Sequence, residues 1–164
     1  MKLIEVTKKK TPTGTYAGYK FDEDDVKKLL DWSSENNIPN RIDDIHCTLL
    51  YSKRHCPNYK APGKLDNPFT VVLSDPKVWT ETTEPAGVLV IELDSPQMVD
   101  RQKKLIKEHN AKFDYDKYTP HITLSYNVEE DYDVKKLSPL PKEIRKMQVV
   151  EEYGEDLDEN WEDD

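Results

Sequence analysis

A six-residue pattern that occurs twice is the feature of this sequence that most limits how the chain can fold. The segment HCTLLY, which begins at His46, and the segment HITLSY, which begins at His121, share His, Thr, Leu and Tyr at the same offsets. Both segments are rich in apolar, β-branched and aromatic residues, which predicts a β-strand in each case. Because side chains alternate along a strand, His46 and Thr48 share one face, and so do His121 and Thr123. We therefore expect two matched strands that each present an imidazole beside a hydroxyl.

The same alternation predicts which motif side chains face the core. Leu49 and Tyr51 in the first copy, and Leu124 and Tyr126 in the second, should point away from the His and Thr side chains, toward an apolar interior. An imidazole and a hydroxyl buried together without partners would be destabilising, so their face is expected to be a working surface. The alternative is that each His is an ordinary sheet residue and that the repeat is a relic of duplication.

Each motif strand is preceded by a predicted helix, Glu23 to Asn37 in the first half and Gln97 to Asn110 in the second. The acidic residues from Asp22 to Asp25 resemble a metal cluster by type, but carboxylates in a first helical turn complement the helix dipole, and we interpret them that way. Ser52 to Pro68 contains three prolines and a glycine and is predicted to be a loop. Further strands are predicted where β-branched and aromatic residues cluster, at Leu3 to Val6, Thr15 to Phe21, Phe69 to Leu73, Val78 to Thr82 and Gly87 to Leu93.

Composition indicates one compact domain. Of the 164 residues, 35% are hydrophobic and 35% are charged, which predicts a modest core beneath a well-solvated surface. The sequence has no apolar stretch of the length of a signal peptide or a membrane span, so a cytoplasmic protein without a membrane partner is expected. Cys47 and Cys56 are interpreted as free thiols. No metal-ligand spacing is found, so neither a metal nor another cofactor is predicted, and the oligomeric state stays open.

The pair of H-x-T-L strands, in a chain of this size, resembles the two-histidine (2H) phosphoesterases, which include cyclic phosphodiesterases and RNA ligase-like enzymes. The resemblance spans most of the chain. It implies an α+β, bilobal, LigT-like fold in which two antiparallel sheets with flanking helices surround a central groove. It also implies that His46 with Thr48, and His121 with Thr123, form one shared catalytic site.

Two histidines can divide acid and base chemistry between them, because their unperturbed pKa values lie at about 6.5. We expect one imidazole to remove the 2'-hydroxyl proton of a 3'-5' phosphodiester while the other protonates the departing 5'-oxygen, which gives a 2',3'-cyclic phosphate. Water can then open that ring with the two roles reversed. Thr48 and Thr123 are expected to donate hydrogen bonds to the non-bridging oxygens. The symmetry of the two motifs leaves open which histidine is the base.

Within the 2H phosphoesterases, the chain most resembles the phage anti-CBASS phosphodiesterases, which degrade the cyclic oligonucleotides that bacterial defence systems use as signals. The segments that carry this resemblance are residues 14–18, 46–52, 59–61, 118–126 and 152–161. The resemblance implies metal-independent hydrolysis of 3'-5' bonds in cyclic di- or oligonucleotides, such as 3',3'-cGAMP, in the host bacterial cytoplasm. The ring size and the preferred bases stay open.

The resemblance also implies base-holding residues, which are Tyr16, Trp79, Glu155 and Trp161. It divides the chain into one domain over residues 1–154 and an acidic tail over residues 155–164, which would fold over the groove as a lid. An acidic tail is more often a disordered, solubilising segment. Trp161 favours the lid, since an indole offers a base a stacking face and is costly to expose. For each base-holding residue, packing against the protein's own surface is the alternative.

The net charge of −9 separates the remaining candidate functions. A protein that holds long nucleic acid normally carries a basic stripe, so a small phosphodiester is the predicted partner rather than a long strand. A 2',3'-cyclic phosphodiesterase or RNA ligase-like enzyme acting on RNA ends shares the motifs but needs a larger polyanion. A non-catalytic sponge for cyclic nucleotides, or an interaction module with a relic motif, has no use for a matched acid and base.

Overall fold

The computed structural model describes residues 12–80, 87–113 and 117–158. Within these ranges the chain forms strands and helices in the order β1 (Gly14–Phe21), α2 (Glu23–Glu35), β2 (His46–Ser52), β3 (Gly63–Leu73), β4 (Lys77–Trp79), β5 (Gly87–Asp94), α3 (Pro96–His109), β6 (His121–Val128), the 3-10 turns η1 (Val134–Lys136) and η2 (Lys142–Ile144), and β7 (Lys146–Leu157). The predicted strand from Leu3 to Val6 lies outside the described residues. The predicted α+β class is confirmed.

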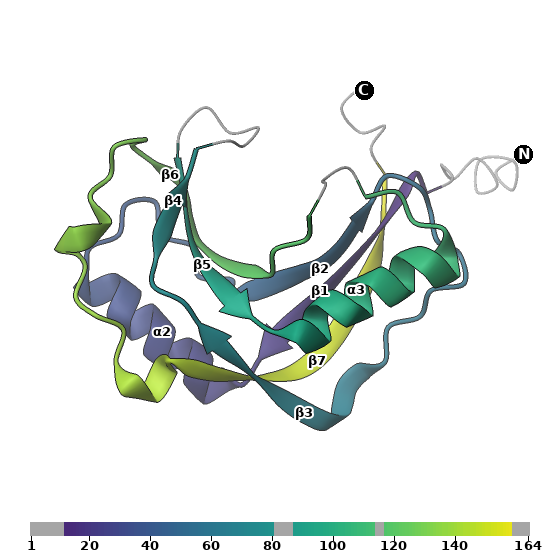
Figure 1. The fold of residues 1–164 in the computed structure, drawn as a ribbon, viewed down its shortest axis with the longest axis horizontal. Coiled ribbons are helices and arrows are strands. Elements are labelled where there is room, and N and C mark those ends of the chain that lie inside the picture. The colour runs from purple at the N-terminus through teal and green to yellow at the C-terminus, as the bar shows by residue number, and fades with distance from the viewer. Residues whose placement is uncertain (1–11, 81–86, 114–116, 159–164) are drawn as a thin grey trace, which may run out of the picture.

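The described strands form one antiparallel sheet in the order β3-β7-β1-β2-β6-β5-β4. Figure 1 shows that the sheet is strongly curved, with β1, β2 and β7 on one side of a wide concave surface and β4, β5 and β6 on the other. The two sheets expected from the sequence are therefore two halves of a single sheet. The halves meet where Cys47 of β2 pairs with Ile122 of β6, and β3 also pairs with β5 through Leu73 and Leu93.

Both helices begin where local capping predicts. The side chain of Asp22 accepts hydrogen bonds from the backbone N–H groups of Asp24 and Asp25 at the start of α2, so the acidic cluster has the predicted structural role. Ser95 caps α3 by accepting from the backbone N–H of Met98. The predicted order, in which one helix precedes each motif strand, is confirmed.

The core lies on the face of the sheet opposite the motif His and Thr side chains. Cys47 and Ile122 are fully buried there, and Met98 of α3 packs on this face with its sulfur 3.9 Å from the Cys47 thiol. Leu29 of α2 belongs to the same apolar cluster. Cys47 and Cys56 are both buried free thiols, as predicted. Neither described helix combines the length and the apolar composition that crossing a membrane requires.

The leucine of the first motif forms a β-bulge. Along β1 the pairing advances by one residue, from Gly18 to Ala17, while along β2 it advances by two, from Thr48 to Leu50. Leu49 is therefore an extra residue in β2, and it is fully buried. Beyond a bulge the alternation of side chains is reversed, because every later residue is shifted by one position.

The leucine of the second motif forms a bulge at the same motif position. In the pairing of β5 with β6, Val90 lies opposite Thr123 while the adjacent Leu89 lies opposite Ser125. Leu124 is therefore the extra residue in β6. The repetition in the sequence thus corresponds to a repeated irregularity of the backbone.

The predicted orientation of the motif tyrosines is wrong because of the two bulges. Tyr51 and Tyr126 follow the bulges and lie on the concave face with the His and Thr side chains, rather than facing the core. They are 45% and 48% exposed, respectively. Leu49 and Leu124, in contrast, are buried as the alternation predicts.

The predicted ends of two segments are wrong. The loop expected from Ser52 to Pro68 ends earlier, because β3 begins at Gly63, where the chain has a φ of 76° and enters the pairing with β7. The acidic tail expected from Glu155 begins later, because β7 continues to Leu157 in register with β1. Composition favours a loop at the first place and a tail at the second. At both places, backbone hydrogen bonds to a neighbouring strand stabilise a strand despite that composition.

Candidate active site

The motif strands β2 and β6 are neighbours, and their pairing brings the four motif residues together. The second residue of one motif is paired with the second residue of the other, in antiparallel orientation. This register sets each histidine opposite the threonine of the other copy, so that His46 faces Thr123 and Thr48 faces His121. We call these four residues the catalytic quartet. The sequence predicts both faces correctly, and the structure adds the cross-strand pairing of unlike residues.

Both imidazoles are held by the same type of backbone contact. The Nδ1–H group of His46 donates to the carbonyl oxygen of Asp44, and that of His121 donates to the carbonyl oxygen of Thr119, each over 3.0 Å. A carbonyl oxygen only accepts, so the contact places the proton on Nδ1 in the neutral form of each ring. Nε2 is then the nitrogen available for proton transfer in both motifs.

The surroundings of the two histidines differ. Burial lowers the pKa of His121, and the nearby His46 lowers it too, whereas the hydrogen bond to Thr119 and the carboxylate of Glu92 act in the opposite direction. Because burial is the largest of these effects, the pKa of His121 lies below its ordinary value. The neutral form of His121 is therefore favoured at neutral pH, which suits it to accept a proton.

Trp79, a predicted base-holding residue, lies directly against His121. The centroids of the indole and imidazole rings are 4.4 Å apart, with their planes inclined by 55°. Glu92 fixes the indole, since its carboxylate accepts a hydrogen bond from Nε1 of Trp79 over 3.0 Å and another from Nζ of Lys77 over 3.0 Å. Burial raises the pKa of Glu92, but these two hydrogen bonds and the charges of Lys77 and His121 together outweigh it, so the pKa lies below its usual range. Sequence reasoning missed Glu92 and Lys77, which carry no motif.

Replacing Glu92 with Gln is expected to lower the pKa of His121 further. The amide oxygen can still accept from Trp79, but the negative charge that favours the protonated imidazole is removed. The midpoint of the His121 titration, followed by NMR of the imidazole protons, should therefore move to lower pH. Glu143→Gln, at an exposed position on η2, serves as the control and should leave the midpoint in place. A midpoint that stays constant or rises in Glu92→Gln would contradict the assigned charge effect.

Tyr16 lies beside the threonine of the first motif. Its hydroxyl is 3.1 Å from Oγ1 of Thr48 and 3.4 Å from the hydroxyl of Tyr153. Burial is the largest cause that raises the pKa of Tyr16 above its ordinary value, so the hydroxyl stays protonated and can donate. Nζ of Lys20 lies 4.9 Å from the centroid of the Tyr153 ring. Sequence reasoning missed Tyr153, whose strand it did not predict.

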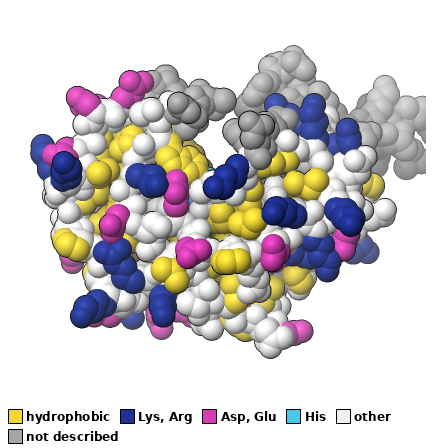
Figure 2. All heavy atoms as spheres, viewed as in Figure 1, with side chains coloured by type: hydrophobic (Ala, Val, Ile, Leu, Met, Phe, Trp, Pro, Cys, Tyr) yellow, Lys and Arg dark blue, Asp and Glu magenta, His cyan; other side chains and the backbone are white. Residues whose placement is uncertain are grey.

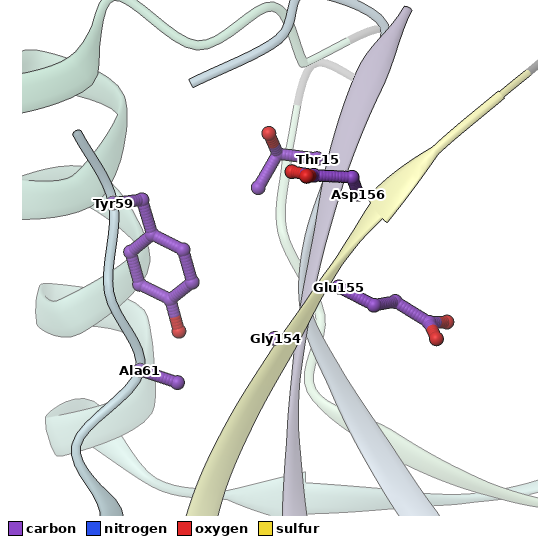
Figure 3. A pocket seen from close by; sticks show the side chains of 6 residues that line it. All are labelled: Thr15, Tyr59, Ala61, Gly154, Glu155 and Asp156. Atoms are coloured by element: carbon purple, nitrogen blue, oxygen red, sulfur yellow. The ribbon is translucent and has the colours of Figure 1, made fainter. Parts of the chain in front are cut away.

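Glu155 shares the concave face with Tyr16, to which it is paired between β7 and β1. A pocket beside β1 and β7 is lined by Thr15, Tyr59, Ala61, Gly154, Glu155 and Asp156. Figure 3 shows that the side chains of Thr15 and Asp156 point into this pocket, whereas that of Glu155 points to the opposite side of β1 and β7. His55 lies on the side of the pocket, where its Nε2 is 3.1 Å from the Asp156 carboxylate.

The structure thus brings Tyr16, Trp79 and Glu155 to the face of the quartet, whereas Trp161 lies outside the described residues. Among the residues that are described, no group of three or more His, Cys, Asp or Glu is placed to hold a metal ion.

The sequence matches one protein family over nearly its whole length. The family described as "Anti-CBASS protein Acb1" matches residues 13–164. The anti-CBASS protein Acb1 of Vibrio phage KVP40 is 31% identical over 150 residues, which are 90% of either chain. That of Yersinia phage phiR1-RT is 33% identical over 156 residues, which cover 92% of this chain and 93% of the relative.

Solved structures establish the fold. The apo form of E. coli LigT is similar with a TM-score of 0.59 at 16% sequence identity, over 88% of this chain and 87% of LigT. A crystal structure described as a phosphoesterase gives a TM-score of 0.60 at 17% identity, over the same shares of the two chains. The predicted LigT-like fold is therefore confirmed. The match over residues 13–164, with phage relatives at 31% and 33% identity, shows that the chain belongs to the anti-CBASS protein Acb1 family.

Proposed function

We propose that this protein is a metal-independent phosphodiesterase that hydrolyses the 3'-5' bonds of cyclic di- or oligonucleotides, such as 3',3'-cGAMP, in the host bacterial cytoplasm. The observation that carries the proposal is the catalytic quartet, in which two imidazoles, each with Nε2 available, alternate with two threonine hydroxyls. Membership of the anti-CBASS family supports a role against the CBASS defence. The LigT-like fold is consistent with phosphodiester chemistry.

In the first step, His121 acts as the base and His46 as the acid. Nε2 of His121 takes the proton of the 2'-hydroxyl, the 2'-oxygen forms a bond to phosphorus, and the bond to the 5'-oxygen breaks as His46 protonates that oxygen. The lowered pKa of His121 supports this assignment, because a base must be neutral before it reacts. Thr48 and Thr123 donate hydrogen bonds to the non-bridging oxygens, where negative charge is concentrated.

The second step opens the 2',3'-cyclic phosphate. His46, now neutral, takes a proton from water as the water oxygen forms a bond to phosphorus. The bond from phosphorus to the 2'-oxygen breaks, and the protonated His121 returns its proton to that oxygen. The product carries a 3'-phosphate, and both histidines regain their starting protonation states.

The bases are proposed to be held by Tyr16, Trp79, Glu155 and Trp161. The contacts of Trp79 with His121 and of Tyr16 with Thr48 support two of these roles, since a base stacked on either ring would adjoin the quartet. The role of Trp161, and the closing of the acidic tail over the groove, rest on the family resemblance alone.

The distribution of charge supports a small ligand. On the face drawn in Figure 2, the Lys and Arg side chains of the described residues are interspersed with Asp and Glu and form no continuous basic band. A long nucleic acid binds mainly through many phosphate contacts to such a band. A cyclic oligonucleotide has few phosphates, so stacking of its bases can supply more of the affinity.

The proposal is tested by incubating the purified protein with 3',3'-cGAMP in the presence of EDTA and resolving the products by chromatography and mass spectrometry. We expect linear products that end in a 2',3'-cyclic phosphate or a 3'-phosphate. Binding without cleavage would instead indicate a sponge. Neither binding nor cleavage, combined with opening of 2',3'-cyclic phosphates at RNA ends, would favour the RNA-end enzyme.

A further inference from the structure

The tyrosine that closes each motif has no part in the mechanism above. Tyr51 and Tyr126 both lie on the concave face and are both nearly half exposed. Within the described residues, Val72 is the other large hydrophobic side chain with comparable exposure. Exposed aromatic rings supply large contact areas at binding surfaces, and here the exposure recurs at the same motif position.

The two tyrosines lie at opposite ends of the catalytic quartet. Tyr51 follows Thr48 along β2, and Tyr126 follows Thr123 along β6. Because the two strands are antiparallel, these directions are opposite. With one bulge residue discounted in each strand, six residue steps separate the tyrosines, or about 20 Å along the strands. The curvature seen in Figure 1 shortens the direct path across the concave face.

Each motif tyrosine also adjoins a residue that is proposed to hold a base. Tyr51 is paired with Tyr16 between β2 and β1. In the other half, Trp79 of β4 is paired with Val88 of β5. On the other edge of β5, Val88 faces the part of β6 between Ser125 and Val128, which contains Tyr126. Each half of the concave face therefore carries a motif tyrosine beside an aromatic residue that is proposed to hold a base, and the half with Tyr51 also carries Tyr153.

We infer that Tyr51 and Tyr126 are two further base-stacking positions, which hold the nucleotides on either side of the bond being cut in a cyclic oligonucleotide. The inference rests on the proposed function. An aromatic ring can stack on any base, so these positions contribute affinity without fixing the sequence of the ring. A cyclic oligonucleotide continues in both directions from the scissile phosphate, which matches two positions at opposite ends of the quartet. A mononucleotide that fills the quartet does not reach both.

The test measures binding to a His46→Ala parent protein, in which cleavage is suppressed. Two ligands are compared by calorimetry, 3',3'-cGAMP and 2',3'-cyclic AMP. Adding Tyr51→Ala or Tyr126→Ala should weaken the binding of 3',3'-cGAMP by roughly 5- to 100-fold, the range expected for loss of one stacked base. The binding of 2',3'-cyclic AMP should weaken by a smaller factor. The matched control is Val72→Ala, which removes an exposed apolar side chain of β3 and should leave the affinity for both ligands unchanged.

Conservative variants separate stacking from other effects. Tyr51→Phe and Tyr126→Phe keep the ring and should retain the affinity for 3',3'-cGAMP. Tyr51→Leu and Tyr126→Leu keep an apolar side chain without a π-face, and they replace the alanine variants if thermal unfolding shows that those are not folded. Equal losses for both ligands, loss in the Phe variants, or no loss in the Ala or Leu variants would overturn the inference and leave the proposed function in place. A wild-type protein that neither binds nor cleaves 3',3'-cGAMP would overturn the proposed function itself.

Discussion

Alanine in place of His46 or of His121 is expected to slow the cleavage of 3',3'-cGAMP by roughly 10²- to 10⁴-fold, the usual contribution of a positioned general acid or base. Each imidazole is held through Nδ1 by a backbone carbonyl, and each has no second histidine on its own strand to replace it. The rate is measured under single-turnover conditions with EDTA present. The double variant should be little slower than either single variant, because the two groups act in one concerted transfer.

The control for this experiment is His55→Ala. His55 contacts the carboxylate of Asp156 on the opposite side of β7 from the quartet, so its loss should leave the rate near that of the wild type. Thermal unfolding of each variant shows whether the fold is retained. A folded His121→Ala protein with nearly full activity would exclude the proposed acid and base.

A second large effect is expected on stability when Arg101 is replaced with Ala. Glu152 is only 2% exposed. Its carboxylate accepts hydrogen bonds from Nε and Nη2 of Arg101, each over 3.0 Å, and from the hydroxyl of Tyr59 over 2.9 Å. Removing the guanidinium leaves a buried negative charge without its cation. The free energy of unfolding should fall by about 3 kcal/mol. For a chain of this length, the midpoint of thermal unfolding should then fall by roughly 6 to 12 °C.

Two variants test the cause of that loss. Lys104→Ala removes an exposed partner of Glu108 on the same helix, over a distance of 3.8 Å, and should change stability by less than about 0.5 kcal/mol. Adding Glu152→Gln to Arg101→Ala removes the unpaired charge and should restore part of the stability. If Arg101→Ala and Lys104→Ala shift the midpoint equally, the ion pair is as weak as a surface pair.

Features set by local chemistry were predictable from the sequence. Asp22 and Ser95 mark the starts of the two helices because capping depends on residues within one turn. The common face of His46 and Thr48 follows from the period of a strand over only three residues. Over longer stretches this reasoning fails, as Tyr51 shows, because a bulge is visible only once the partner strand is known.

Features that depend on distant pairing could not be predicted from one sequence. Glu92 reaches the site because β4, β5 and β6 are neighbours, and nothing in the residues around it indicates that Trp79 will donate to its carboxylate. The end of β7 is rich in acidic residues, which are unfavourable in strands when considered alone. Its pairing with β1 satisfies the backbone hydrogen bonds and leaves the side chains of Glu155 and Asp156 exposed.

The pairing of Cys47 with Ile122 joins equivalent positions of the two motifs. A strand that met a second copy of itself across a two-fold axis would form this same contact, because an isologous interface sets each residue against its symmetry mate. A half-length chain with one such strand would therefore lack a complete acid and base as a monomer and gain both on dimerisation. In the present chain the two halves are covalently linked, so their sequences need not be identical. In this structure an indole lies beside one imidazole, and a tyrosine hydroxyl lies beside the opposite threonine.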